Sequence, residues 1–218
     1  MDDLDVAAML CSLMCHDLVS PVGALVNGVE ILEEEEDKKI QDQALGLLSH
    51  SAEEASHRLQ FFRLAFGASG GLGAQIHLGD AERVLTGLLM NGRIKLKWAA
   101  PTRSLDKTIV KLALNMAFAG VESLGRGGSV DVDVALEGEP NSSDVLVTIM
   151  VNGEGARFKE NCKELLTGEA AEDELTTRSV QPYYTQRLAE GLGATIVIDD
   201  SKADCITIST RVTNVDLN

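Results

Sequence analysis

A histidine followed directly by an aspartate stands near the start of the chain, within the string Met14-Cys15-His16-Asp17-Leu18-Val19-Ser20-Pro21. An imidazole can carry a phosphoryl group on one ring nitrogen, and a neighbouring carboxylate can hydrogen-bond the opposite nitrogen and so fix the tautomer. In this interpretation His16 is the nucleophile and Asp17 is the group that orients it. Because an N–P bond has a high transfer potential, the pair predicts a histidine that receives a phosphoryl group and passes it on.

The other histidines and the cysteines predict simpler roles. No other histidine has both an adjacent acid and a downstream proline, so we interpret the rest as solvated surface residues: His50, His57 and His77. Cys11 and Cys15 fall on one helical face near His16, but a fourth metal ligand is not evident there. Free cysteines usually behave as small hydrophobic residues. The sequence therefore predicts no metal site, and free, partly buried thiols at Cys11, Cys15, Cys162 and Cys205.

The overall composition restricts the class of protein and of partner. The chain has 218 residues, of which 44% are hydrophobic and 24% are charged, which is ordinary usage for one or two globular domains. Its 19 basic and 34 acidic residues give a formal net charge of −15, and a surface so negative repels nucleic acid and anionic lipid. The first residues are acidic, and we find no stretch that approaches the ~20 apolar residues needed to span a bilayer. We therefore expect a cytoplasmic protein that binds neither nucleic acid nor membranes.

Apolar residues recur at steps of three and four in two stretches between Leu4 and Phe66, which is typical of two amphipathic helices. The acidic run Glu33–Asp37 separates the stretches, and Pro21 should kink the first helix without ending it. We predict an antiparallel helical hairpin over residues 1–68. A two-helix hairpin cannot enclose its own apolar stripes, so we expect a homodimer with a four-helix bundle. The alternative is that the hairpin packs on the rest of its own chain.

A glycine-rich break, Gly67–Gly73, separates this hairpin from a second predicted domain over residues 74–218. The patterns in that domain predict strands that pair in hairpins, with helices grouped together. The sequence therefore predicts an α+β fold whose second domain is an α/β sandwich, with one sheet covered on one face by helices. The expected helices are 80–90, 105–124, 161–166 and 183–190, and the expected strands are 93–98, 130–136, 145–151, 195–198 and 205–212.

The string His16-Asp17-Leu18-x-x-Pro21 resembles the H-box of two-component histidine kinases, which has His, an acid, an aliphatic residue, two residues of any type and Pro. It stands in the first helix of a predicted hairpin that precedes an α+β domain, as in that family. In such a kinase the second domain binds ATP. The family does so through an asparagine that holds Mg²⁺, an aspartate that meets adenine, and a glycine-rich loop whose N–H groups meet the phosphates.

The first two of these nucleotide motifs are altered here. The metal-binding asparagine is replaced in the string Ala119-Gly120-Val121-Glu122-Ser123-Leu124. Asn115, one helical turn before Ala119, better matches a position that does not bind the metal. The adenine motif reads Asn152-Gly153-Glu154-Gly155, which keeps the glycines of the turn but replaces the acid and so weakens the adenine contact.

The third motif has lost its glycines. The matching segment Thr176–Tyr183 contains none, its Pro182 lacks an N–H donor, and the nearby acidic segment Glu169–Glu174 opposes a triphosphate. The sequence therefore keeps the acceptor histidine and lacks the site that would supply its phosphoryl group. Over nearly its whole length it resembles the ChpT-type histidine phosphotransferases of alphaproteobacterial phosphorelays.

This resemblance implies a degenerate histidine-kinase ATPase-like second domain and no cofactor of the chain's own. In that family the phosphoryl group comes from the receiver domain of a hybrid histidine kinase. It is passed to aspartates in receiver domains of CtrA-like and CpdR-like regulators, which control the cell cycle and proteolysis. Mg²⁺ is then expected on the partner receiver domain, which supplies most of the charge stabilisation.

Residues on the same helical face as His16 are expected to contact the receiver domain. They are Ser12, Val19, Ser20, Gly23 and Asn27, with Arg58 and Phe62 as weaker candidates on the second helix. Two other interpretations stay open: a divergent ATP-dependent sensor histidine kinase, and a non-catalytic dimeric protein that binds receiver domains. The altered nucleotide motifs weigh against the first, and the retained H-box weighs against the second.

Overall fold

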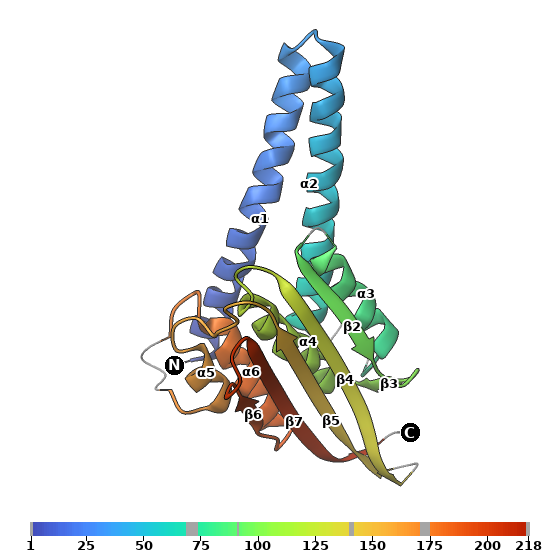
Figure 1. Cartoon of the computed structure of the whole chain (residues 1–218), viewed down its shortest axis with the longest axis vertical. Coiled ribbons are helices and arrows are strands. Elements are labelled where there is room, and N and C mark those ends of the chain that lie inside the picture. Colours follow the sequence, from blue (N-terminus) through green and yellow to red (C-terminus); the bar gives the residue numbers. More distant parts are fainter. Residues whose placement is uncertain (1, 69–73, 91, 140–141, 171–174, 217–218) are drawn as a thin grey trace.

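Two long helices form the predicted N-terminal hairpin, α1 (Asp3–Glu34) and α2 (Lys38–Ala65), which projects away from an α+β domain (Figure 1). The acidic turn lies between the helices, as the sequence predicts. The computed structural model describes residues 2–68, 74–90, 92–139, 142–170 and 175–216. Most of the predicted glycine-rich break therefore lies outside the described residues.

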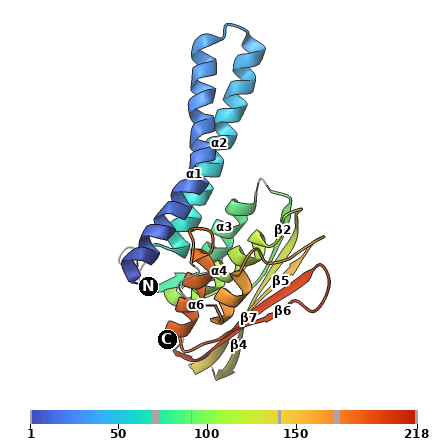
Figure 2. The same ribbon diagram turned by 90° about the vertical axis from the view of Figure 1, so that its left-hand side faces the viewer.

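Local sequence explains where each helix of the hairpin begins. The side chains of Asp2 and Asp37 each accept a hydrogen bond from a backbone N–H in the first turn of the helix that follows. The first helix continues through Pro21, which is buried, and Figure 2 shows that α1 bends along its length. The prediction that the helix would not end at this proline is confirmed.

Small residues let the two helices of the hairpin approach closely. A Cβ atom added at Gly28 of α1 would lie only 2.8 Å from the Cγ atom of Leu48 on α2. The residues buried on the α2 side of this contact are also small, namely Ala44, Ser51 and Ala55.

The hairpin leaves a long apolar stripe in solvent. Its exposed members are Val19, Val22, Val26 and Val29 on α1, with Ile40, Leu45, Leu47 and Leu59 on α2. By length and composition alone, α1 also qualifies as a membrane-spanning helix, which corrects our statement that no stretch approaches this limit. An amphipathic helix whose apolar face is exposed in the described chain has the same length and apolar composition without crossing a membrane.

A five-stranded sheet forms the second domain, in the order β2-β4-β5-β7-β6. The strands are β2 (Ile94–Ala99), β4 (Gly128–Glu139), β5 (Ser142–Asn152), β6 (Ile196–Asp199) and β7 (Cys205–Asp216). The pair β2 and β4 is parallel, and the other neighbouring pairs are antiparallel. Alternate residues of β5 are buried, which is the period-2 pattern of a strand with one covered face: Val145, Val147, Ile149 and Val151.

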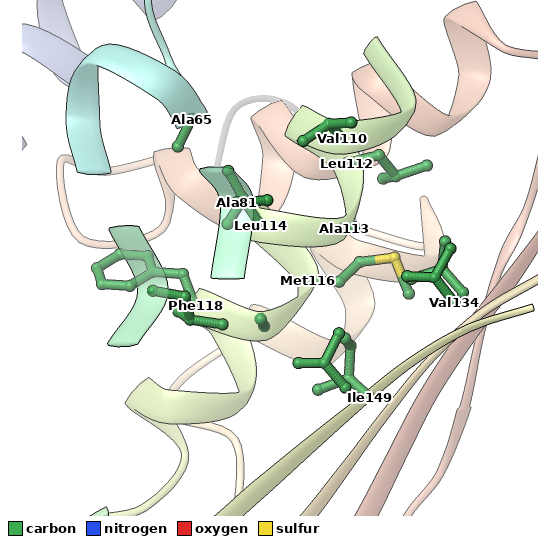
Figure 3. Close-up of a cluster of buried hydrophobic side chains, with 14 of the residues drawn as sticks. Ala65, Ala81, Val110, Leu112, Ala113, Leu114, Met116, Phe118, Val134 and Ile149 are labelled. Atoms are coloured by element: carbon green, nitrogen blue, oxygen red, sulfur yellow. The ribbon is translucent and has the colours of Figure 1, made fainter. Parts of the chain in front are cut away.

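Helices cover one face of this sheet, so the predicted two-layer α+β sandwich is confirmed (Figure 2). They are α3 (Leu78–Leu89), α4 (Lys107–Glu122), α5 (Cys162–Thr167) and α6 (Val180–Gly191). The central helix α4 is buried continuously from Ile109 to Gly120, and Figure 3 shows its Met116 directed at Val134 of the sheet. A Cβ atom at Gly120 would lie 2.8 Å from Val151, so this helix lies directly on the strands.

Several predicted boundaries are wrong for identifiable reasons. The sequence predicts a helix from Leu105, but residues Ser104–Asp106 form a short strand, β3, which pairs antiparallel with β1 (Gln75–His77). The helix begins afterwards because the Asp106 carboxylate caps it. Helix α6 begins at Val180 instead of Tyr183, because a proline in the first helical turn costs no hydrogen bond.

His77 is exposed, as predicted, and its side chain also caps α3 by accepting a hydrogen bond from the Gly79 N–H. The prediction of a solvated surface residue is wrong only for His57. His57 is half-buried on α2, and its ring lies against Gly87 of α3. His50 is exposed, as predicted.

The base of the hairpin is built into the second domain. The α2 residues Phe61, Phe62 and Ala65 belong to its main hydrophobic core. The Lys111 ammonium of α4 donates to the Gly67 carbonyl, and burial lowers the pKa of this lysine. The first half of α1 packs on α5 and α6 through a smaller cluster that includes Leu10, Leu165, Val180 and Tyr183. The lower hairpin therefore packs on its own chain, although Leu4 and Leu59 stay exposed there.

A buried amide joins the helices at this junction. The Asn115 Nδ2 donates to the Ala65 carbonyl of α2 at 3.1 Å and to the Lys111 carbonyl at 2.9 Å. The Gln181 Nε2 of α6 donates to the Asn115 Oδ1 at 3.1 Å and to its carbonyl at 2.9 Å. One side chain of α4 therefore connects α2 to α6.

We predict that Asn115→Ala lowers the free energy of unfolding by about 2–3 kcal/mol, because it leaves buried polar groups without partners. For a chain of this size the loss corresponds to a melting temperature lower by roughly 5–10 °C. Thermal and urea unfolding would measure it. Gln60→Ala, which removes an exposed amide of α2, is the matched control and should change the free energy by less than about 0.5 kcal/mol. Equal stability of the two variants would contradict the assigned role of Asn115.

Candidate functional site

The His16 side chain projects into solvent from the middle of α1, with 84% of its surface exposed. Its Nδ1 atom lies 3.3 Å from Oδ1 of Asp17, whose side chain is only 21% exposed. An ionised carboxylate can only accept hydrogen bonds, so this contact places the proton of a neutral ring on Nδ1. The Nε2 atom of that neutral ring then keeps its lone pair.

A chain of charged groups continues from Asp17 to the second helix. The Arg58 Nη1 of α2 lies 3.6 Å from Oδ2 of Asp17. The same guanidinium donates from Nε and Nη2 to Oε1 of Glu54, at 3.1 Å and 2.9 Å. The sequence predicts Arg58 as a partner contact and does not single out Glu54. The only available signal was their i, i+4 spacing, which brings the two side chains together on one helix.

The predicted docking residues on α1 form an exposed strip around His16. Ser12, Val19, Ser20 and Asn27 are exposed, and a Cβ atom added at half-buried Gly23 would meet nothing within 4 Å. The prediction for Phe62 is wrong. Its ring is 4% exposed and stacks edge-on against Phe61 in the core, because the last turns of α2 are packed into the second domain.

A cleft of about 340 Å³ lies beside His16, between α1, α4 and the start of α6. His16 and Asp17 line one side of it, and Ala119 and Pro182 line the other. His16 therefore borders the place where the resemblance to kinases would put the nucleotide. The remaining lining residues are Leu13, Phe118, Glu122, Ser123, Phe158, Lys159, Glu160, Cys162, Arg178, Ser179 and Gln181.

Among the described residues, the positions that match the kinase ligands for Mg²⁺ and phosphates carry other side chains. Ala119 is buried and offers no ligand atom. Asn115 cannot replace it, because both ends of its amide are engaged inside the core. The first turn of α6, in the segment that matches the phosphate loop, meets α4 through the Gln181 amide, which donates to Asn115, and its Val180 and Pro182 are also buried.

The turn that would meet adenine is held by other contacts. The Gly153 N–H donates to the Asp204 carbonyl, and the Gly155 N–H donates to the Asp204 carboxylate at 2.7 Å. Glu154 pairs with Arg126 at 2.5 Å. None of the four residues 152–155 lines the cleft. Of the acidic segment Glu169–Glu174, only the first two residues are among those described.

The cysteines do not gather into a site. Cys11 and Cys15 are exposed, and Cys162 and Cys205 are half-buried, so partial burial is correct only for the second pair. Burial, together with Glu122 and Glu164, raises the pKa of the Cys162 thiol to about 12. This cleft residue therefore stays a neutral thiol at physiological pH. Within the described residues, no group of three or more His, Cys, Asp or Glu side chains is arranged to hold a metal ion.

The fold and sequence agree with those of known phosphotransferases. Residues 78–204 match the family described as the histidine phosphotransferase C-terminal domain. The chain is 43% identical to the protein phosphotransferase ChpT of Brucella abortus (strain 2308), over 93% of its own length and 94% of the relative. A solved bacterial phosphotransferase is 41% identical and superposes with a TM-score of 0.81, covering 96% of this chain and 97% of that one. With an exposed histidine in the H-box position and a match that extends over nearly the whole sequence, the chain belongs to the ChpT family of histidine phosphotransferases.

Proposed function

We propose that this phosphotransferase carries phosphoryl groups between receiver domains, with His16 as the only covalent carrier. The observation that carries the proposal is the imidazole itself. It is exposed on the side of Nε2 and held by a carboxylate on the side of Nδ1. The resemblance of the sequence to ChpT-type proteins supplies the class of partner.

In the accepting step, the Nε2 lone pair of His16 attacks the phosphorus of a receiver phospho-aspartate. The N–P bond forms, the acyl P–O bond breaks, and the electron pair leaves on the receiver carboxylate. The ring, which keeps its proton on Nδ1, becomes a cation, and the Asp17 carboxylate stabilises that charge. The donating step is the reverse, with a different aspartate as the nucleophile.

The receiver domain is proposed to supply Mg²⁺ and most of the charge stabilisation, because phosphoryl transfer depends mainly on positioning and electrostatics. The donor is then a hybrid histidine kinase receiver, and the acceptors are receiver domains of CtrA-like and CpdR-like regulators. The exposed strip Ser12, Val19, Ser20, Gly23 and Asn27 is the proposed contact surface.

We further propose that the protein is a homodimer whose hairpins form a four-helix bundle. The support is the uncovered valine stripe on the upper part of α1, namely Val22, Val26 and Val29, none of which is a proposed receiver contact (Figure 1). A second copy would cover it with an equivalent stripe. This also accounts for the apolar character of α1 in a cytoplasmic protein that binds no membrane.

We predict that His16→Ala accepts no phosphoryl group when the full chain is incubated with a radiolabelled phospho-receiver domain. His50→Ala is the matched control, because it removes an exposed histidine of α2, and it should be labelled like the wild type. Gel autoradiography at neutral pH would measure both. Label on the His16→Ala chain would show that another residue is the acceptor.

We expect Mg-ATP to bind more weakly than about 1 mM, which corresponds to a free energy of less than about 4 kcal/mol. Isothermal titration calorimetry would measure this. Ala119→Asn should not restore binding, because Val180, Gln181 and Pro182 still occupy the phosphate position. Micromolar binding by the wild type, followed by labelling of His16 from ATP, would favour the divergent kinase.

We predict that Val26→Lys converts the dimer into monomers, because it places a charge in the apolar centre of the proposed bundle. Val197→Lys is the control, since Val197 lies on β6 and is similarly exposed, at 59% against 53% for Val26. Sedimentation velocity at micromolar concentration would distinguish the two states. A wild-type chain that sediments as a monomer would contradict the proposed bundle.

A further inference from the structure

We propose that Arg58 is a positioning residue for His16: it holds the Asp17 carboxylate in place, and Glu54 holds Arg58. The sequence suggests a different role for this arginine, a contact with the partner. The inference rests on the proposed function, because it explains how the acceptor ring is kept ready for transfer.

The distances place these groups in a line that crosses from α2 to α1. Glu54 takes two N–H groups of the guanidinium on a single oxygen atom, which fixes the arginine rotamer. The guanidinium then presents Nη1 to one oxygen of Asp17, while the other Asp17 oxygen faces Nδ1 of His16. Each side chain therefore restricts the orientation of the next one, from Glu54 to Arg58, Asp17 and His16.

The ring of His16 is far more exposed than the three side chains behind it. The His16 side chain is 84% exposed, whereas those of Asp17, Arg58 and Glu54 are 21%, 30% and 33% exposed. An arginine that served to contact a partner would extend into solvent. This one lies back against the hairpin, with its donors directed at two carboxylates of its own chain.

The charges also favour a positioning role. The aspartate alone could turn away from the ring, because a surface carboxylate gains little from one weak contact. Arg58 removes that freedom, since it attracts the oxygen that does not face His16. When the ring becomes a cation on phosphorylation, it meets a carboxylate already aligned toward Nδ1. Arg58 would thus favour the Nδ1–H tautomer of the free ring. It would also favour transfer, because the phosphorylated cation meets an aligned carboxylate.

The test uses the full-length protein and a small phosphoryl donor, so that no receiver contact contributes. Phosphoramidate transfers its phosphoryl group to the Nε2 atom, and ammonia leaves with the electrons of the broken P–N bond. We expect Arg58→Ala to slow this labelling of His16 about tenfold, by analogy with the loss of a group that orients a metal-binding histidine. Arg58→Lys, which keeps the charge, should recover part of the rate. Arg63→Gln, at an exposed arginine of the same helix, is the control and should label normally.

Two-dimensional ¹⁵N NMR of the neutral ring supplies the second readout, because it distinguishes the Nδ1–H and Nε2–H tautomers. We expect Nδ1–H to predominate in the wild type and Nε2–H to increase in Arg58→Ala, with unchanged thermal stability. The double variant Asp17→Ala with Arg58→Ala should label no more slowly than Asp17→Ala alone, because Arg58 acts only through the carboxylate.

Three results would overturn the proposal. An unchanged tautomer and rate in Arg58→Ala would show that Asp17 needs no support. An unchanged tautomer and phosphoramidate rate, combined with slower transfer from a phospho-receiver, would make Arg58 a partner contact. A shifted tautomer in Arg58→Ala without a change in the labelling rate would show that orienting the ring does not speed phosphoryl transfer. Failure of the wild type to exchange with receiver domains would instead count against the proposed function, since both measurements on Arg58 need no receiver.

Discussion

The contact of Gln181 with Asn115 is the interaction on which the rest of this structure depends. It brings the first turn of α6 onto α4, and the same asparagine holds the end of α2. A phosphate loop would need backbone N–H groups and free space at this position. Here one hydrogen-bonded pair occupies it and joins the hairpin to the second domain. The segment that matches the phosphate loop of the kinases thus also joins α6 to α4 and, through Asn115, to α2.

On the proposed function, a fixed backbone matters because His16 receives its phosphoryl group from another protein and not from ATP bound to its own chain. Most of the barrier to phosphoryl transfer can be lowered by positioning and by charges fixed before the partner arrives. In this chain α1 is held by α2 on one side and, through Leu10 and its neighbours, by α5 and α6 on the other. His16 lies between these two supports and is itself left open to solvent. An acceptor that must meet a separate protein needs both properties at once, a fixed backbone and an exposed ring.

Periodicity in the sequence predicted the hairpin and the long strands, because their apolar residues repeat over many turns or pairs. It could not predict β1 and β3, which have three residues each and show no period. It also misplaced Phe62, because a helix face that packs into another domain has the same pattern as one that faces solvent. His16 could be singled out as the proposed acceptor from a local motif. The line from Glu54 through Arg58 to Asp17 could not, since it depends on how the two helices are aligned across the hairpin.

On the proposed function, a single imidazole must serve both the donor and the acceptor receiver, so the two partners compete for one surface. The same strip of α1 then has to bind different receiver domains in turn, and the bound state must be short-lived. Small and uncharged side chains suit this requirement, since Ser12, Ser20 and Gly23 allow close approach but provide no ion pair that would slow release. The net direction of phosphoryl flow is then set by how much of each receiver is phosphorylated. The carrier can work in either direction because the protonated ring, held by Asp17, has the same geometry in both.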